Sequence, residues 1–143
     1  LSADGPLPGT ADATYARYDV LGRKTWEIGP VGENNRRLVT RTTYRAADDK
    51  PSKVESGTIS SNPNDTAFVL NSQTDIEYNA RRLAVKTAVS SGGTAYAITQ
   101  ASYDARNREQ CTVVRLNLAS PPASASNAIA IRCYFGRCKS LSS

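Results

Sequence analysis

Side chains suited to acid–base, nucleophilic or metal chemistry are few in this sequence. The chain has 143 residues, with no histidine and three cysteines. Without histidine, Ser-His-Asp and Cys-His catalysis and zinc sites with a histidine ligand are excluded, and three thiols are too few for a four-cysteine site. No carboxylate or glycine pattern typical of calcium or phosphate loops is present. We therefore expect a protein that is not an enzyme and that binds no metal or cofactor.

The nearest approach to a paired-carboxylate site is the dipeptide Asp48-Asp49. Two carboxylates can divide acid and base roles when their environments separate their pKa values. This dipeptide falls where the sequence predicts a turn, however. We therefore interpret both side chains as solvated turn residues.

The three cysteines are Cys111, Cys133 and Cys138. Four residues with a central glycine separate Cys133 from Cys138, so a turn could bring their thiols together as a hairpin disulfide. Cys111 would then be a free thiol, buried as a small hydrophobic residue. The alternative is that all three cysteines are reduced.

Basic residues exceed acidic ones, with 18 Lys and Arg against 13 Asp and Glu. The best local case for a nucleic-acid site is the group Arg36, Arg37, Arg41 and Arg45. Basic residues are spread along the chain and alternate with Glu and Asp, as on the solvated face of a sheet, and no zinc-finger, helix-turn-helix or RNP pattern accompanies them. We therefore expect that nucleic acid is not a partner.

The elements that carry these residues are indicated by a segment that recurs four times. Each copy begins at a tyrosine, and the four are Tyr18, Tyr44, Tyr78 and Tyr103. The spacing between the tyrosines is unequal, which favours hairpins joined by loops of different length over a helical repeat. A chain built from copies of one small unit is usually a scaffold.

The first copy explains why the unit is a hairpin. Asp19 can accept hydrogen bonds from backbone amides inside a turn, and Gly22 can adopt a left-handed conformation at little cost. On the following strand, Trp26 and Ile28 share one parity, which is typical of a half-buried strand. We expect the same parity after the third and fourth tyrosines, at Leu83, Val85, Thr87 and Val89, and at Val114, Leu116 and Leu118.

The other copies depart from the first in their turn residues. The fourth has Asn107 in place of glycine, and asparagine tolerates the left-handed conformation. The second has Arg45 in place of aspartate and Asp48 in place of glycine, and we expect the third, after Tyr78, to have lost one turn residue. We expect an all-β fold in which each tyrosine ends a strand and antiparallel hairpins form a twisted, curved open sheet.

The pattern Tyr-Asp-x-x-Gly-Arg resembles the Rhs or YD repeat of large bacterial surface and toxin proteins and of the teneurins. The first copy is complete at Tyr18, Asp19, Gly22 and Arg23, and the fourth keeps Tyr103, Asp104 and Arg108. The resemblance implies a non-enzymatic segment of a shell that encloses or displays a polypeptide. It also implies further repeats in a longer parent chain and a location outside the cell or on the bacterial surface.

Composition suggests three parts along the chain. Residues 1–12 are a flexible lead-in, residues 13–118 are the repeat array, and residues 119–143 are a linker and a C-terminal appendage separate from the array. Marked turns are expected at Asn62-Pro63-Asn64-Asp65 and at Ser91-Gly92-Gly93-Thr94. No signal segment and no apolar run near 18 residues is visible, so we expect no membrane span.

A rival function is a surface module that binds carbohydrate. Exposed aromatic rings on a sheet can stack on sugars, and the candidates are Tyr15, Trp26, Tyr44 and Tyr96. Aromatic residues on β-faces are more often core residues or cross-strand partners. The scaffold function is therefore preferred.

Overall fold

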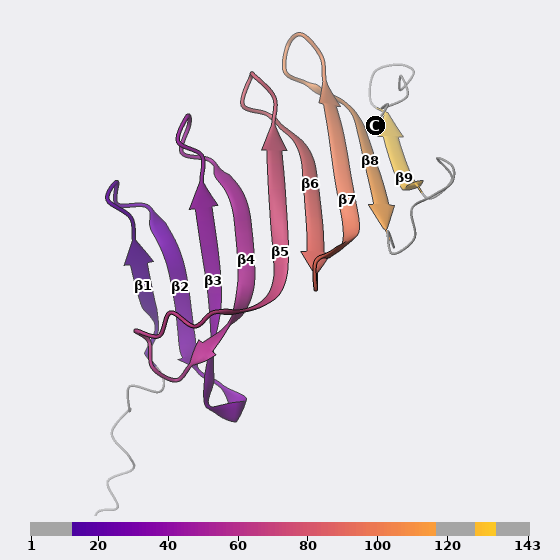
Figure 1. Cartoon of the computed structure of the whole chain (residues 1–143). Coiled ribbons are helices and arrows are strands. Elements are labelled where there is room, and N and C mark those ends of the chain that lie inside the picture. Colours follow the sequence, from indigo (N-terminus) through magenta and orange to yellow (C-terminus); the bar gives the residue numbers. More distant parts are fainter. Residues whose placement is uncertain (1–12, 117–127, 134–143) are drawn as a thin grey trace, which may run out of the picture.

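The structure is a computed structural model that describes residues 13–116 and 128–133. These residues form one antiparallel sheet of nine strands, which follow one another across the sheet in sequence order (Figure 1). The strands are β1 (Tyr15–Tyr18), β2 (Lys24–Val31), β3 (Arg36–Tyr44), β4 (Pro51–Ser60), β5 (Val69–Tyr78), β6 (Ala84–Ser91), β7 (Thr94–Tyr103), β8 (Glu109–Leu116) and β9 (Ala128–Cys133). The sheet is open and twisted, and a single short 3-10 turn (Glu33–Asn35) is the one helical element described. The expected all-β fold is confirmed.

The four repeat tyrosines end the incoming strands, as predicted. They are the last residues of β1, β3, β5 and β7. The four turns that follow all lie at one edge of the sheet, the upper edge in Figure 1. We call this edge, made by residues 19–23, 45–50, 79–83 and 104–108, the turn edge.

The two other predicted turns are also present. Gly92 and Gly93 join β6 to β7 with φ angles of 57° and 79°, a pair that glycine accepts without strain. In the β4–β5 connection, the backbone NH of Asp65 donates to the carbonyl of Asn62 at 3.1 Å.

The β4–β5 connection creates the main hydrophobic core of the described chain. Residues 61–68 pass back across the first strands (Figure 1), and Phe68 packs against the cluster of Ile28, Val39 and Ile59. Gly57 is required beneath it, because a Cβ there would lie 2.2 Å from the carbonyl oxygen of Val69. One face of β1–β4 is therefore covered by the chain itself.

In the later repeats the predicted apolar residues on β6 and β8 share one face, but it is the face opposite to that of Trp26. Register pairs connect Trp26 on β2 through Arg41, Glu55 and Gln73 to Ser90 on β6. Val89 therefore faces the side opposite to Trp26, and so does Val114 on β8. Leu118 lies outside the described residues. Period-2 patterning identifies alternation but leaves open which face of the sheet carries the apolar side chains, and that face differs between the repeats.

The chain beyond the predicted linker is partly integrated into the sheet. Residues Ala128–Cys133 form β9 and pair with β8, so this stretch continues the array where a separate appendage had been expected. The lead-in at 1–12, most of the predicted linker and residues 134–143 lie outside the described residues. No helix in the described part is long and apolar enough to cross a membrane.

The expectation of a free thiol at Cys111 is corrected. Cys111 is disulfide-bonded and 5% exposed, and the register of β8 and β9 places it opposite Cys133. Within one chain of three cysteines, a bond at Cys111 and the predicted Cys133–Cys138 bridge cannot both form. Cys138 itself lies outside the described residues. The spacing argument failed because it did not anticipate that β9 would pair with β8.

Candidate functional site

The first turn assigns a role to each residue of its motif. Asp19 Oδ1 accepts hydrogen bonds from the backbone NH groups of Leu21 at 2.9 Å and Arg23 at 3.0 Å, while Oδ2 accepts one from Arg23 Nε at 2.7 Å. Gly22 has a φ of 77°. Burial alone would raise the pKa of Asp19, but the hydrogen bonds from Arg23 and Leu21 outweigh it and lower that pKa.

The fourth turn repeats this geometry. Asp104 accepts from the backbone NH groups of Arg106 and Arg108 and from Arg108 Nε, and Asn107 takes the left-handed position with a φ of 63°. The backbone hydrogen bond from Arg108 is the main cause that lowers the pKa of Asp104. The conservative interpretation of Asn107 is thereby confirmed.

The third turn has the same length as the first, which corrects the prediction of a lost residue. Asn79 Oδ1 replaces the carboxylate and accepts from the backbone NH groups of Arg81 at 2.9 Å and Leu83 at 3.0 Å. Arg82 occupies the left-handed position with a φ of 63°. A non-glycine residue there costs roughly 1 kcal/mol or more, and arginine lacks the local hydrogen bonds of asparagine.

The second turn is the irregular one, because it is a residue longer. The NH of Arg45 donates to the carbonyl of Lys50, and Asp49, not Asp48, is left-handed with a φ of 57°. Asp48 lies 3.1 Å from Arg45 Nη1 with its side chain 1% exposed, whereas Asp49 is 67% exposed and bonded to Arg23. Asp48 is therefore not solvated, and the two carboxylates face different arginines instead of one shared site.

The tyrosines join successive hairpins. Three of the four hydroxyls donate to the carbonyl of the residue that begins the preceding outgoing strand. The three bonds are Tyr44 to Lys24 at 2.8 Å, Tyr78 to Pro51 at 2.9 Å and Tyr103 to Ala84 at 2.9 Å. In the described part of the chain, the hydroxyl of Tyr18 has no such acceptor, and Tyr18 is 62% exposed.

Cations also connect each turn to the next along the turn edge. Arg23 lies 4.9 Å above the ring of Tyr44 and 2.5 Å from Asp49 Oδ1. The later contacts are Lys50 Nζ to the carbonyl of Arg82 at 2.7 Å, and Arg81 Nη1 to the carbonyl of Asp104 at 3.0 Å. The turn edge is thus a continuous row of polar contacts.

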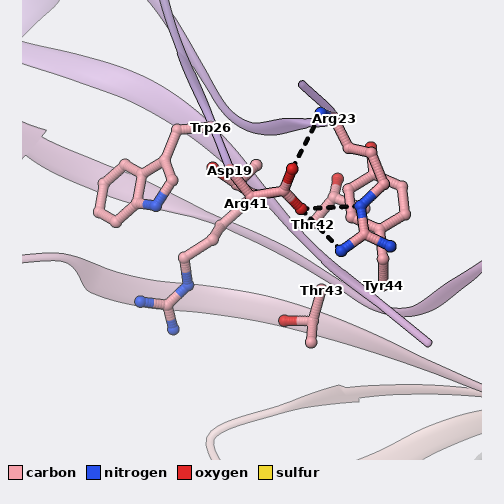
Figure 2. Close-up of a pocket in the computed structure, with 8 residues that line it drawn as sticks. Asp19, Arg23, Trp26, Arg41, Thr42, Thr43 and Tyr44 are labelled. Atoms are coloured by element: carbon pink, nitrogen blue, oxygen red, sulfur yellow. Dashed lines mark hydrogen bonds and ion pairs between the residues drawn. The ribbon is translucent and has the colours of Figure 1, made fainter. Parts of the chain in front are cut away.

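A shallow hollow of about 320 Å³ lies between the first two hairpins. Figure 2 shows Trp26 and Arg41 on one side of it and Arg23 beside Tyr44 on the other. The aromatic rings are already in contact with guanidinium groups, because Arg17 lies 4.3 Å from the Trp26 centroid and Arg37 lies 5.1 Å from that of Tyr15. The sugar-stacking hypothesis is left with one of its four rings exposed, Tyr96 at 46%.

Arg37 is the residue whose role the sequence did not reveal. It is 1% exposed, and its guanidinium donates to the carbonyls of Ser61 at 2.7 Å, Ala13 at 2.8 Å and Gly29 at 2.9 Å. It thereby holds together the chain before β1, strand β2 and the start of residues 61–68, which we call the covering loop. The sequence had grouped it with solvated arginines, so that grouping is wrong for Arg37.

Arg41 is also structural. Its Nε and Nη2 donate to the two carboxylate oxygens of Glu55 at 2.7 and 2.8 Å, and Glu55 is 7% exposed. The hydrogen bond from Arg41 lowers the pKa of Glu55, and the same bond raises that of Arg41. The predicted basic group is therefore divided among buried and exposed positions and does not form one surface.

Among residues 13–116, no group of three or more potential metal ligands is present. Comparison of the chain with family models, curated proteins and solved structures found no match. The arrangement of the site is thus a set of turns and tyrosine contacts that join hairpins to one another.

Proposed function

We propose that this chain is a non-enzymatic structural segment of an Rhs or YD-repeat shell, part of a bacterial cell-surface or secreted toxin-type protein that encloses or displays a polypeptide. The observation that carries the proposal is the repeated bond from a tyrosine hydroxyl to the preceding hairpin. Units that meet through the same contact at each interface form an array that further units can extend. In such an array, a preceding hairpin would supply the carbonyl that Tyr18 does not find among the described residues.

The uncovered part of the sheet supports the polypeptide-holding role. Strands β5, β6 and β7 contain no buried side chain. On the face opposite Trp26, the half-buried side chains include Val54, Ile76, Val89 and Val114. A single sheet layer with apolar side chains on one face is stabilised when another layer covers that face.

The scaffold function is tested by measuring whether a substitution in the last repeat lowers the unfolding midpoint of the first repeat. Tyr103→Phe removes one hydroxyl bond, which should lower the free energy of unfolding by about 1 kcal/mol. Trp26 is the single tryptophan, so its fluorescence reports on the first hairpin. In one cooperative array, the denaturant midpoint measured at Trp26 falls in the variant.

Tyr96→Phe is the matched control, because the hydroxyl of this exposed tyrosine makes no hydrogen bond within the described residues. It should leave the midpoint unchanged. A Trp26 midpoint unaffected by Tyr103→Phe, with a shift in far-UV circular dichroism, would show independent hairpins and count against a scaffold.

The polypeptide-holding role is tested with reduced, carboxymethylated lactalbumin as an unfolded probe. We expect saturable binding, measured by fluorescence anisotropy, that weakens in Val54→Thr/Val89→Thr. These substitutions preserve side-chain shape and make the uncovered face more polar. Val31→Thr on β2 is the control outside this face and should bind normally. Absence of binding by the wild-type chain would contradict this part of the proposal.

A further inference from the structure

Charge is distributed unevenly along the turn edge. In the first two turns the charges balance, with Asp19 beside Arg23 and with Asp48 and Asp49 beside Arg45 and Lys50. The third turn contains Arg81 and Arg82 and no carboxylate, because Asn79 replaces the aspartate. The fourth contains Arg106 and Arg108 against Asp104 alone. The half of the turn edge between β5 and β8 is therefore cationic.

Two of these arginines, Arg82 and Arg106, have side chains without a hydrogen-bond or ion-pair partner in the described part of the chain. The other two interact with Asp104 in the fourth turn. Arg81 donates to its backbone carbonyl, and Arg108 forms an ion pair with its carboxylate. The guanidinium groups of Arg82 and Arg106 are exposed and make no hydrogen bond or ion pair within residues 13–116. The two turns that contain these residues, 79–83 and 104–108, are adjacent along the turn edge (Figure 1).

Backbone strain makes Arg82 more informative than an ordinary surface arginine. It has a φ of 63° at the position filled by Gly22 in the first turn and by Asn107 in the fourth. Glycine would relieve the strain, and no contact of the Arg82 side chain compensates for it within the described residues. A strained residue without internal benefit suggests a role in contact with a partner.

We propose that the third and fourth turns form a binding surface for an acidic polysaccharide, with Arg82 and Arg106 as its principal contacts and Arg81 and Arg108 beside them. Guanidinium groups bind carboxylate and sulfate groups through paired hydrogen bonds. This inference is independent of the scaffold role, because it concerns the exposed turns and not the contacts between hairpins.

Other polyanions fit these turns less well. Single-stranded nucleic acids stack their bases on aromatic rings, and Tyr103, the aromatic residue nearest the fourth turn, is half-buried with its hydroxyl bonded to Ala84. Peripheral membrane binding combines basic residues with apolar ones, and the tips of these turns carry only Ala80 and Ala105. A linear polymer of acidic sugars requires neither feature.

Binding is tested by fluorescence anisotropy with labelled heparin and polygalacturonate at about 50 mM salt, where electrostatic contacts are strong. We expect Arg82→Gly/Arg106→Ala to weaken binding by about tenfold or more. The slope of log affinity against log salt should fall by about two, because two cations are removed. Arg82→Gly should also raise the unfolding midpoint, so weaker binding cannot be explained by a loss of fold.

The control Arg36→Ala/Lys53→Ala removes the same charge at positions outside the third and fourth turns and should change affinity by less than about twofold, as expected if the contacts are local. Three results would overturn the proposal: no binding by the wild-type chain, an equal loss in the control variant, or tighter binding to single-stranded DNA or to phosphatidylglycerol vesicles than to either polysaccharide.

Discussion

The first four strands and the three that follow share one sheet and one hairpin geometry, but they differ in how their side chains are covered. In β1–β4, residues 61–68 cross one face and bury Ile28, Val39 and Ile59 to 2% exposure or less. In β5–β7 no side chain is buried. Repeated turns therefore do not by themselves produce a core, and the covering loop is what distinguishes the first region.

The same contrast extends to the charged residues. In the first region, Arg37 and Glu55 are buried. Arg37 donates hydrogen bonds to backbone carbonyls, and Glu55 accepts hydrogen bonds from Arg41. In the second region, Lys86 and Glu77 pair across strands with their side chains 35% and 62% exposed. Buried charges are costly to leave unpaired, whereas exposed pairs contribute little. The stability of the chain should accordingly be concentrated in β1–β4.

Replacing Arg37 should have the largest effect on this contrast. Arg37→Leu leaves the carbonyls of Ser61, Ala13 and Gly29 without their donor, and each unsatisfied buried group costs roughly 1–3 kcal/mol. We expect a loss of about 3 kcal/mol or more in the free energy of unfolding, measured by urea denaturation. The neighbouring Arg36→Leu is the control, because Arg36 is exposed and should change stability by less than about 0.5 kcal/mol.

A small effect of Arg37→Leu would show that the covering loop is held by its other contacts, which are the packing of Phe68 and the hydrogen bonds from Arg17 to the carbonyls of Pro63 and Asp65. Hydrogen exchange of residues 61–68 distinguishes the two cases, because loss of the arginine should speed exchange in this loop while β5–β7 stay unchanged.

Truncating one isoleucine in each region sharpens the comparison. Ile59 is 0% exposed beneath the covering loop, so Ile59→Ala should cost about 2–4 kcal/mol. Ile76 is half-buried on the uncovered face, where solvent can fill the space, so Ile76→Ala should cost about 1 kcal/mol. Both are measured by denaturant unfolding. Equal costs would mean that the uncovered face is as well packed as the core, and the contrast would fail.

The hairpins could be predicted from the sequence because their causes are local. Asp19 and Gly22 determine a turn through bonds within five residues, and each tyrosine marks the end of its strand. The core could not be predicted in the same way, since it depends on Phe68 returning to Trp26 across the sheet. The covered face, the burial of Arg37 and the bond at Cys111 similarly depend on contacts between distant segments.

The errors within the turns have a different origin. Matching Asp48 to glycine assumed that the copies differ only by substitution, whereas the second turn contains an extra residue and places Asp49 in the left-handed position. Arg82 was missed because arginine is a poor sequence signal for that conformation. The sequence signal that could have revealed it is the alignment of Asn79 with Asp19, which gives the third turn the length of the first.

At low pH, the turns should differ according to whether they contain an aspartate, and not according to the region of the sheet in which they lie. This effect should be smaller than those of the substitutions above. The pKa of Asp19 is lowered despite its burial, and that of Asp104 is lowered chiefly by the backbone bond from Arg108. A lowered folded-state pKa gives stability that is present above the unfolded value of about 3.9 and is lost as the pH falls through the folded value. The first and fourth turns should therefore loosen in acid, while the third, with Asn79, should not.

Carbon-13 NMR of the carboxyl groups measures both pKa values, and the amide signals of Gly22, Arg82 and Asn107 report on each turn between about pH 5 and pH 2. We expect the signals of Gly22 and Asn107 to shift and that of Arg82 to remain. Asp104→Asn converts the fourth turn to the chemistry of the third and should abolish the shift at Asn107 alone. If Arg82 shifted together with its neighbours, acid would be acting on the sheet as a whole, and the turns would not be independent of the regions that carry them.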